Sequence, residues 1–411
     1  MDEVRKLGLA VEERWRAKNF DELLFPDIAR TALEEFALTA SIQYIDILKW
    51  LNTTQELPKQ QNIEATFGQP PVTLFASQRF YVEALFWLDG TTAIHSHAFA
   101  GAFQVLHGSS IHHEWGFEPR ERINARMFIG DVYPKGAALL RKGDVHTIMP
   151  GSRFIHSVFH LDHPSVTLVV RTYPLEEAKP QLTYQCPHLA IDRLDIEEAT
   201  RRRLQGLRTL WEMRHPAYDI HLAELVERSD LFTTLWILEQ DLATRGDIGK
   251  CVPLFMAARE KHGRPVDFLI PLAEVRMRQE QIMRKRALVT DAEQRFFLAV
   301  LLNAPNKASA LDLLRMKYPD KDPVDVIVDF VRGFATSGPG GGALLDVPGD
   351  EASLTVLRLQ LQGKSPAETA KGVEAGHPAG PLTAGKVASL CDELRASLLK
   401  PLFIDAGPDL R

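Results

Sequence analysis

The chain has 411 residues, of which 45% are hydrophobic and 25% charged, and its formal net charge is -6. These values are typical of a folded globular protein of two or three domains, at about 100 to 200 residues each. A mildly acidic chain of this size does not favour a polyanionic partner, so we expect no nucleic-acid binding.

Cysteine is rare in this chain. Cys186, Cys251 and Cys391 lie far apart and form no CxxC pair. A disulfide framework or a thiolate zinc site would need more cysteines or closer ones, so the pattern indicates a reducing compartment, by default the cytoplasm. The N-terminus is charged, and no uncharged apolar run reaches about 18 residues, so we expect neither a signal peptide nor a membrane span.

The sequence pattern of residues 1–71 predicts an N-terminal helical segment and a connector. Apolar residues recur at helical spacing from Ile28 to Leu51, with few helix breakers between them. The stretch from Thr53 to Pro71 is polar and contains several prolines, which is typical of a connector. We expect the helices to pack on the region that follows.

The sequence pattern of residues 72–175 predicts a β domain. About nine short runs rich in Val, Ile, Phe and Tyr, separated by turn residues, extend from Val72 to Tyr173. Many short strands in about a hundred residues are typical of an antiparallel sandwich or barrel of the jelly-roll type. The interior of a small barrel can hold a ligand or a metal ion.

After Pro174 the pattern is helical to the end of the chain. We expect a helical domain over residues 190–335 and a C-terminal helical segment over residues 343–411. The glycine-rich stretch from Thr336 to Gly342 lacks the strand and helix that would flank a phosphate loop, so we interpret it as a linker. The predicted fold class is therefore α+β and multidomain, with a central antiparallel β-barrel between helical regions.

Histidines concentrate in the β domain. Nine of the fourteen histidines lie between residues 95 and 163. His95 and His97 are two residues apart, and the side chains of a strand alternate between its faces, so both rings point to the same side. Imidazoles that converge inside a barrel are suitable ligands for Fe, Zn, Cu or Ni.

A third ligand is expected from the stretch that follows the Pro-Gly turn at Pro150. His156 lies on that predicted strand, whereas His146 precedes the turn and is the alternative ligand. We interpret His160 as a partner that orients a ligand imidazole. His112 and His113 alternate in direction, so at most one points inward, and we interpret both as rim or surface residues.

Two stretches of the β domain resemble the motifs of the cupin superfamily. The first motif is a glycine, an HxH pair, a glutamate and a later glycine, and the second is a proline, a glycine and a histidine. The matching residues are Gly90, His95, His97, Gly108, Pro150, Gly151 and His156. The glutamate position falls on Gly101 or Ala102, neither of which can bind a metal. The resemblance therefore implies a cupin-type barrel with three histidine ligands and no carboxylate.

Within the cupins, this set resembles the cysteine dioxygenase-like enzymes, also called thiol dioxygenases, over about residues 72–175. The resemblance implies one Fe(2+) ion, a small or carrier-held thiol substrate, O2 as co-substrate and a sulfinate product. Tyr173 stands where the family has a tyrosine near the iron. Val169 and Arg171 replace the family's serine and histidine that relay to it, and Gly101 replaces the cysteine that forms a crosslink to tyrosine in some members.

Under this resemblance, Tyr173, Arg79 and Arg171 are the candidate catalytic residues. An arginine would hold a substrate carboxylate through two parallel hydrogen bonds, and Tyr173 would donate a hydrogen bond beside the iron. The structural alternatives are solvated or salt-bridged arginines and a tyrosine that closes the barrel core.

Two other functions stay open at this point. One is a non-catalytic cupin that binds a metal or small ligand and docks a partner through its helical region. The other is a cupin isomerase or hydrolase that uses Zn or Ni, because one fold hosts many chemistries. The C-terminal helices are also compatible with a homo-oligomer.

Overall fold

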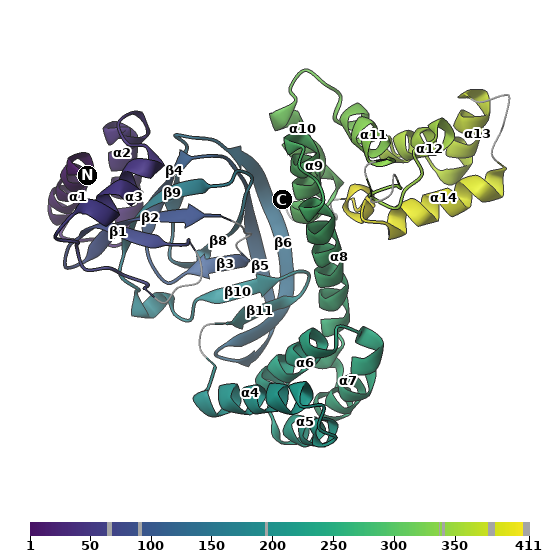
Figure 1. Ribbon diagram of the computed structural model, residues 1–411, viewed down its shortest axis with the longest axis horizontal. Helices are drawn as coiled ribbons and strands as arrows, with labels where there is room; N and C mark the ends of the chain where they lie inside the picture. The colour runs from purple at the N-terminus through teal and green to yellow at the C-terminus, as the bar shows by residue number, and fades with distance from the viewer. Residues whose placement is uncertain are drawn as a thin grey trace.

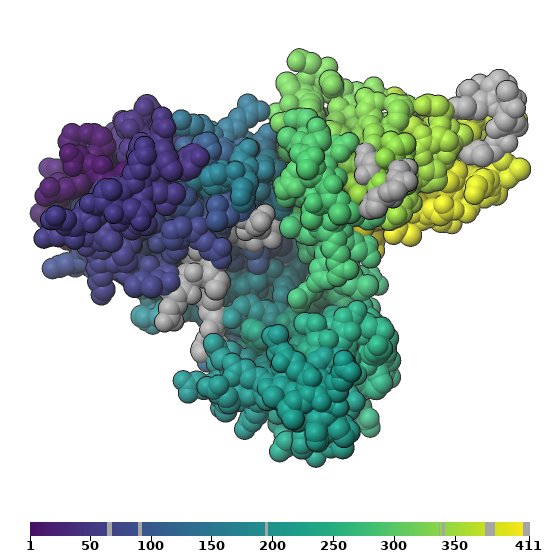
Figure 2. Space-filling view, in the orientation of Figure 1, coloured from purple at the N-terminus to yellow at the C-terminus, as the bar shows by residue number. Residues whose placement is uncertain are grey.

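The computed structural model describes residues 1–63, 68–88, 93–193, 196–336, 338, 342–376 and 383–405 (Figure 1). Gly90, which belongs to the first cupin-like motif, lies outside the described residues, as do parts of the glycine-rich stretch. The strands and the N-terminal helices form one lobe, and the later helices form two further lobes beside it (Figure 2).

Three N-terminal helices cover one face of the first β-sheet (Figure 1), as expected from the apolar spacing. They are α1 (Asp2–Arg16), α2 (Phe25–Phe36) and α3 (Tyr44–Thr53). Their buried side chains, such as Leu7 and Phe25, share one apolar core with Phe80 and Val166 of the sheet. Each fully buried side chain of this size stabilises the fold by about 1.5–3 kcal/mol, so the helical segment is an integral part of the domain.

Eleven strands form two antiparallel sheets in the described part of the chain. The first sheet has five strands in the order β1-β2-β9-β4-β7, and the second closes as a six-stranded barrel in the order β10-β11-β6-β5-β8-β3. The strands are β1 (Pro71–Ala76), β2 (Phe80–Trp87), β3 (Ile94–His97), β4 (Gly101–His107), β5 (Ser110–Asn124), β6 (Met127–Leu140), β7 (Val145–Ile148), β8 (Gly151–His160), β9 (Ser165–Thr172), β10 (Leu182–Gln185) and β11 (Leu189–Asp192).

Two separate interiors result from this arrangement. The inter-sheet space lies between the five-stranded sheet and strands β6 and β8, and its apolar residues include Phe99, Phe103 and Phe154. The barrel interior lies inside the six-stranded barrel, where Trp115, Ile155, Tyr184 and Ala190 form a small core of their own. The partly buried residues packed on that core are Ile94, Phe117, Phe128, Val132, Leu182 and Cys186.

The prediction that the chain is helical from Pro174 onward is wrong for two segments. Strands β10 and β11 pair with each other and with β3 and β6, and they close the six-stranded barrel. Each has only four residues, and prolines lie close to both in the sequence. These strands are stabilised by partners that are distant in sequence, so local periodicity does not identify them.

The remaining helices follow the predicted pattern. Asp291 and Asp322 cap the helices that follow them, because each side chain accepts a hydrogen bond from a backbone N–H of the first turn. The helices are α4 (Glu198–Glu212), α5 (Ala217–Arg228), α6 (Leu231–Arg245), α7 (Ile248–His262), α8 (Leu269–Ala287), α9 (Ala292–Asn303), α10 (Lys307–Lys317), α11 (Pro323–Phe334), α12 (Glu351–Leu361), α13 (Pro366–Gly376) and α14 (Ala384–Ala396).

Two apolar cores divide these helices at α8. Leu272, near the start of α8, belongs to a core with α4–α7 and with Leu189 of β11. Ile282, further along α8, belongs to a second core that continues to Leu402 and includes Phe159 of β8. Helix α8 therefore joins the two helical lobes along the outer side of the barrel (Figure 1).

The architecture confirms the predicted fold class, which is α+β with an antiparallel barrel between helical regions. In the part of the chain that the structure describes, every helix is too short or too polar to cross a lipid bilayer.

Candidate metal centre

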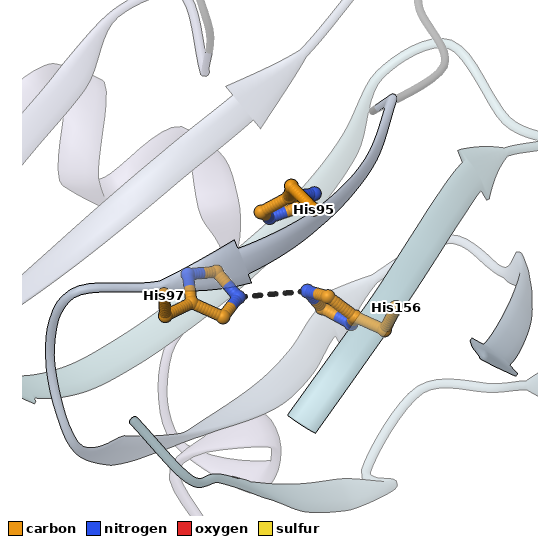
Figure 3. A group of neighbouring side chains, drawn as sticks. All are labelled: His95, His97 and His156. Atoms are coloured by element: carbon orange, nitrogen blue, oxygen red, sulfur yellow. Dashed lines mark hydrogen bonds between the residues drawn. The ribbon is translucent and has the colours of Figure 1, made fainter. Parts of the chain in front are cut away.

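The imidazoles of His95, His97 and His156 meet in one cluster (Figure 3). Strand β3 carries the first two, and its antiparallel pairing with β8 sets His95 directly opposite His156. The pairing is irregular between His95 and His97, which still face the same side. One nitrogen from each of the three rings lies within 4.8 Å of the other two.

The spacing of these nitrogens is suited to a single metal ion. Nε2 of His97 and Nε2 of His156 are 2.8 Å apart. Two nitrogens bound to one ion at about 2.1 Å and at right angles would lie about 3 Å apart. The third ring, that of His95, has its centroid 4.5 Å from that of His97 and 4.7 Å from that of His156. Small ring rotations would therefore bring the three nitrogens around one point.

Two hydrogen bonds fix how these rings are presented. Nδ1 of His95 donates to the carbonyl oxygen of Ala93 at 2.7 Å, which leaves Nε2 unprotonated and free to bind a metal. Nδ1 of His156 lies 3.0 Å from Nε2 of His112. Such contacts to the ring nitrogen that is not a ligand are the usual way in which metal-binding histidines are oriented.

Burial keeps the cluster in the neutral form that a metal requires. It lowers the pKa of His95, and it lowers the pKa of His97 and of His156 well below the usual range. The neighbouring histidines lower the pKa of His156 further, and Arg171 contributes to the effect on His97. Neutral imidazoles have a free lone pair, so the donor set is ready to bind a cation without first losing protons.

Gly101 explains why the cluster has no carboxylate. It begins β4, at one of the positions where the common cupin motif has glutamate. A Cβ atom at this residue would lie 2.2 Å from the carbonyl oxygen of Val170 and 3.0 Å from Cα of Arg171. The other possible position, Ala102, packs in the core beneath the N-terminal helices. Neither position can therefore present a side-chain ligand.

Aromatic rings surround the histidines. The ring centroid of Phe99 is 4.5 Å from that of His97, and that of Phe154 is 4.6 Å from that of His156. Phe103 lies 6.2 Å from His156, again between ring centroids. Apolar walls of this kind lower the local dielectric constant and strengthen electrostatic interactions at the centre.

Arg171 lies beside this aromatic wall. Its guanidinium carbon is 3.5 Å from the ring centroid of Phe99, and Nη1 donates to the buried carboxylate of Glu83 at 3.0 Å. Its Nε is buried and has no hydrogen-bond partner among the described residues. Arg171 is therefore salt-bridged, as in the structural alternative to a substrate-binding arginine. It also keeps one donor, Nε, without a partner among the described residues.

The structure does not bring Tyr173 and Arg79 to the histidines. The hydroxyl of Tyr173 donates to the carbonyl oxygen of Ser77 at 3.2 Å, and its ring packs on Tyr81. Arg79 is exposed, and its guanidinium lies 4.5 Å from the ring centroid of Phe20 in the N-terminal segment. In this conformation neither side chain is directed at the cluster.

The prediction that His112 and His113 are rim or surface residues is wrong. They are 2% and 1% exposed, because β5 pairs with β6 on one side and β8 on the other and both of its faces are covered. His112 faces the cluster of His95, His97 and His156. Burial lowers the pKa of His112 to about 3 and that of His113 to about 4. No signal in an adjacent His-His pair shows which ring points inward.

His160 does not orient a ligand, contrary to our interpretation. Its Nδ1 is 3.0 Å from Oγ of Ser110, and its ring stacks on Trp87 with centroids 4.4 Å apart. Four residues of strand separate it from His156, or about 13 Å. The histidine that contacts a ring nitrogen of His156 is His112.

His146 lies near the centre but outside the cluster of described ligand atoms. Its ring centroid is 5.2 Å from that of His112 and 5.6 Å from that of Phe103. The geometry therefore brings His156, and not His146, to His95 and His97.

A cavity of about 670 Å³ is lined by Ser96 and Tyr184, which face away from the histidines, so it is separate from the cluster.

Comparisons with known proteins give structural similarity only. No protein-family model and no curated protein matches the sequence. Among solved structures, a hydroquinone 1,2-dioxygenase from Sphingomonas with 4-hydroxybenzoate bound is 13% identical, at a TM-score of 0.20 over 25% of this chain and 65% of that one. This chain thus spans less than two thirds of that protein's length.

Two further structures show similarity of the same extent. A cupin-2 domain containing protein from Shewanella frigidimarina is 14% identical, at a TM-score of 0.19 over 33% of this chain and 96% of that one. The hydroquinone 1,2-dioxygenase PnpCD in complex with Cd²⁺ and 4-hydroxybenzonitrile is 14% identical, at a TM-score of 0.20 over 29% of this chain and 82% of that one.

Proposed function

We propose that this chain is a mononuclear non-heme Fe(II) oxygenase of the cupin superfamily, similar to the thiol dioxygenases, that adds O2 to the sulfur of a thiol. The observation that carries the proposal is the donor set. His95, His97 and His156 supply three neutral imidazoles, and neither Gly101 nor Ala102, the two candidates for the glutamate position of the cupin motif, can present a carboxylate. Three imidazoles on one side of an ion leave its other side open to substrates.

The reaction balances without a further reductant. A thiolate and O2 give a sulfinate: two sulfur–oxygen bonds form, the oxygen–oxygen bond breaks, and sulfur loses four electrons. When bound, Fe(II) would supply the open coordination positions and the redox chemistry that this reaction needs. The three histidines would hold the ion, and Phe99, Phe103 and Phe154 would exclude bulk water from the reacting atoms.

Arg171 supports a substrate that carries a carboxylate. Its unused Nε is a buried donor beside Phe99, and Phe99 contacts His97. An anion that accepts from this donor would sit next to the metal centre, where a buried charge-assisted hydrogen bond is strong. Glu83 holds the other edge of the guanidinium in place. We therefore assign substrate orientation to Arg171, in preference to Arg79 and Tyr173.

The test is metal content followed by oxygen uptake. Anaerobically purified protein is reconstituted with Fe(II) and mixed with cysteine, 3-mercaptopropionate, homocysteine or cysteamine. We expect one equivalent of iron and thiol-dependent uptake. The three thiols that carry a carboxylate should be preferred over cysteamine, which lacks one.

A matched variant tests the role of Arg171. Arg171→Lys keeps a positive charge for Glu83 but removes Nε, so the preference for carboxylate thiols should shrink while iron content stays constant. An unchanged preference would contradict this role. Bound iron without uptake on any thiol would refute the oxygenase activity and leave a non-catalytic metal-binding protein, whereas no bound metal would refute the metal centre itself.

A further inference from the structure

His112 lies next to the cluster of His95, His97 and His156 without belonging to it. Strands β5 and β8 pair with Glu114 opposite His156 and His112 opposite Val158. His112 is thus the diagonal neighbour of His156 on the same face, a relationship that brings long or aromatic side chains within reach of each other. The result is the 3.0 Å contact between Nε2 of His112 and Nδ1 of His156.

The surroundings of His112 leave its ring little freedom. The ring centroids of Phe154 and His156 lie 6.0 and 5.2 Å from its own, and Phe103 is 6.1 Å away. The side chain is almost completely buried. Because protein interiors are packed as densely as organic crystals, a ring in such a position keeps one orientation.

We propose that His112 is a positioning residue for the metal centre: it accepts a hydrogen bond from Nδ1–H of His156 and so presents Nε2 of His156 to the ion. This inference rests on the proposed three-histidine centre. A histidine that binds a metal through Nε2 must carry its proton on Nδ1, and a buried N–H without an acceptor costs free energy. His112 supplies that acceptor.

The contrast with His95 makes His112 a specific target. The corresponding nitrogen of His95 donates to the backbone carbonyl of Ala93, which no side-chain substitution removes. For His156 the same task is performed by a side chain, so it can be removed without changing any of the three ligands. His112 is therefore a separable determinant of metal affinity.

The experiment measures Co²⁺ binding to the metal-free full-length chain, by competition with a chelating dye and by the visible spectrum of the bound ion. His112→Phe keeps an aromatic ring but removes the acceptor, and should weaken binding about 10–100-fold. His112→Gln places an amide oxygen near the position of Nε2 and should restore most of the affinity and the spectrum. His112→Asn is too short to reach, so it should stay as weak as the Phe variant.

His113→Gln is the matched control. His113 is equally buried on the same strand, but it lies next to His112 and points to the other face. It should leave both the affinity and the spectrum unchanged. If His112→Phe binds Co²⁺ as the unaltered chain does, or if His113→Gln is equally weakened, the positioning role is refuted.

The His112→Gln and His112→Asn variants still decide the test if His112→Phe fails to fold. Equal binding by the Gln and Asn variants would then refute the role, since both side chains are polar and differ in reach. Failure of the unaltered chain to bind Co²⁺ would be a different result: it would overturn the three-histidine centre and the inference with it.

Discussion

The inter-sheet space and the barrel interior lie on opposite faces of shared strands and differ in chemistry. On β3, His95 and His97 face the inter-sheet space, while Ile94 packs on the core of the barrel interior. On β8, His156 and Ile155 divide in the same way. A side-chain period of two thus places a polar site and an apolar support on opposite faces of the same backbone.

This comparison predicts that metal binding and fold stability can be changed separately. Residues facing the inter-sheet space should control the metal, and their direct neighbours in sequence should control stability.

The largest expected effect is loss of the metal. Replacing His95, His97 or His156 with Ala removes one of three ligands, and affinity should fall by more than about a hundredfold, since loss of even an outer-shell partner costs about 10–100-fold. Metal content after gel filtration measures this. His146→Ala should keep its metal, and the reverse pattern for His146 and His156 would show that the third ligand is wrongly assigned.

Ile155→Ala should have the opposite effect, one residue away from His156. Ile155 is 3% exposed in the core of the barrel interior. Truncating such a side chain typically costs about 2–5 kcal/mol of unfolding free energy. Denaturant unfolding measures the loss, and the folded variant should still bind one equivalent of metal. A loss of metal at unchanged unfolding free energy would contradict the separation of metal binding from fold stability.

Gly101→Ala tests the opposite wall of the inter-sheet space. The added Cβ would lie 2.2 Å from the carbonyl oxygen of Val170, so the strands must shift, at a cost of about 1–3 kcal/mol as in other overpacked cores. Gly136→Ala is the control, because a Cβ at that residue meets nothing within 4 Å. Unfolding curves that coincide for the two variants would contradict the crowding at Gly101.

Buried histidines outside the cluster should make stability depend on pH. Burial lowers the pKa of His113 from 6.5 to about 4, so below pH 6.5 the unfolded chain binds a proton that the folded chain does not. The free energy of unfolding should therefore fall as the pH falls from 6.5 to about 4, by about 1.4 kcal/mol per pH unit for each such histidine. His113→Gln should reduce this slope by about that amount in metal-free protein, and an unchanged slope would contradict it.

Much of the centre could be predicted from local pattern. The HxH pair and the Pro-Gly turn with its following histidine depend on strand alternation and turn chemistry, which are written in a few consecutive residues. They led to the three rings that the structure brings together. The same kind of signal identified the N-terminal helices and most later helices, where apolar spacing is strong.

What could not be predicted depends on partners distant in sequence. The role of His112 requires the register of β5 against β8, and an adjacent pair of histidines does not show which ring faces inward. Strands β10 and β11 exist because the barrel closes through them. Arg79 and Arg171 are both strand-end arginines in the sequence, but one lies on Phe20 at the surface and the other is buried beside Phe99.

Gly101 also limits how the donor set of the centre could be redesigned. A side chain at Gly101 would point at the backbone of the neighbouring strand. A mutation to glutamate would have to move two strands before a carboxylate could enter the site. A fourth, carboxylate ligand would therefore have to be engineered at another position of the inter-sheet space.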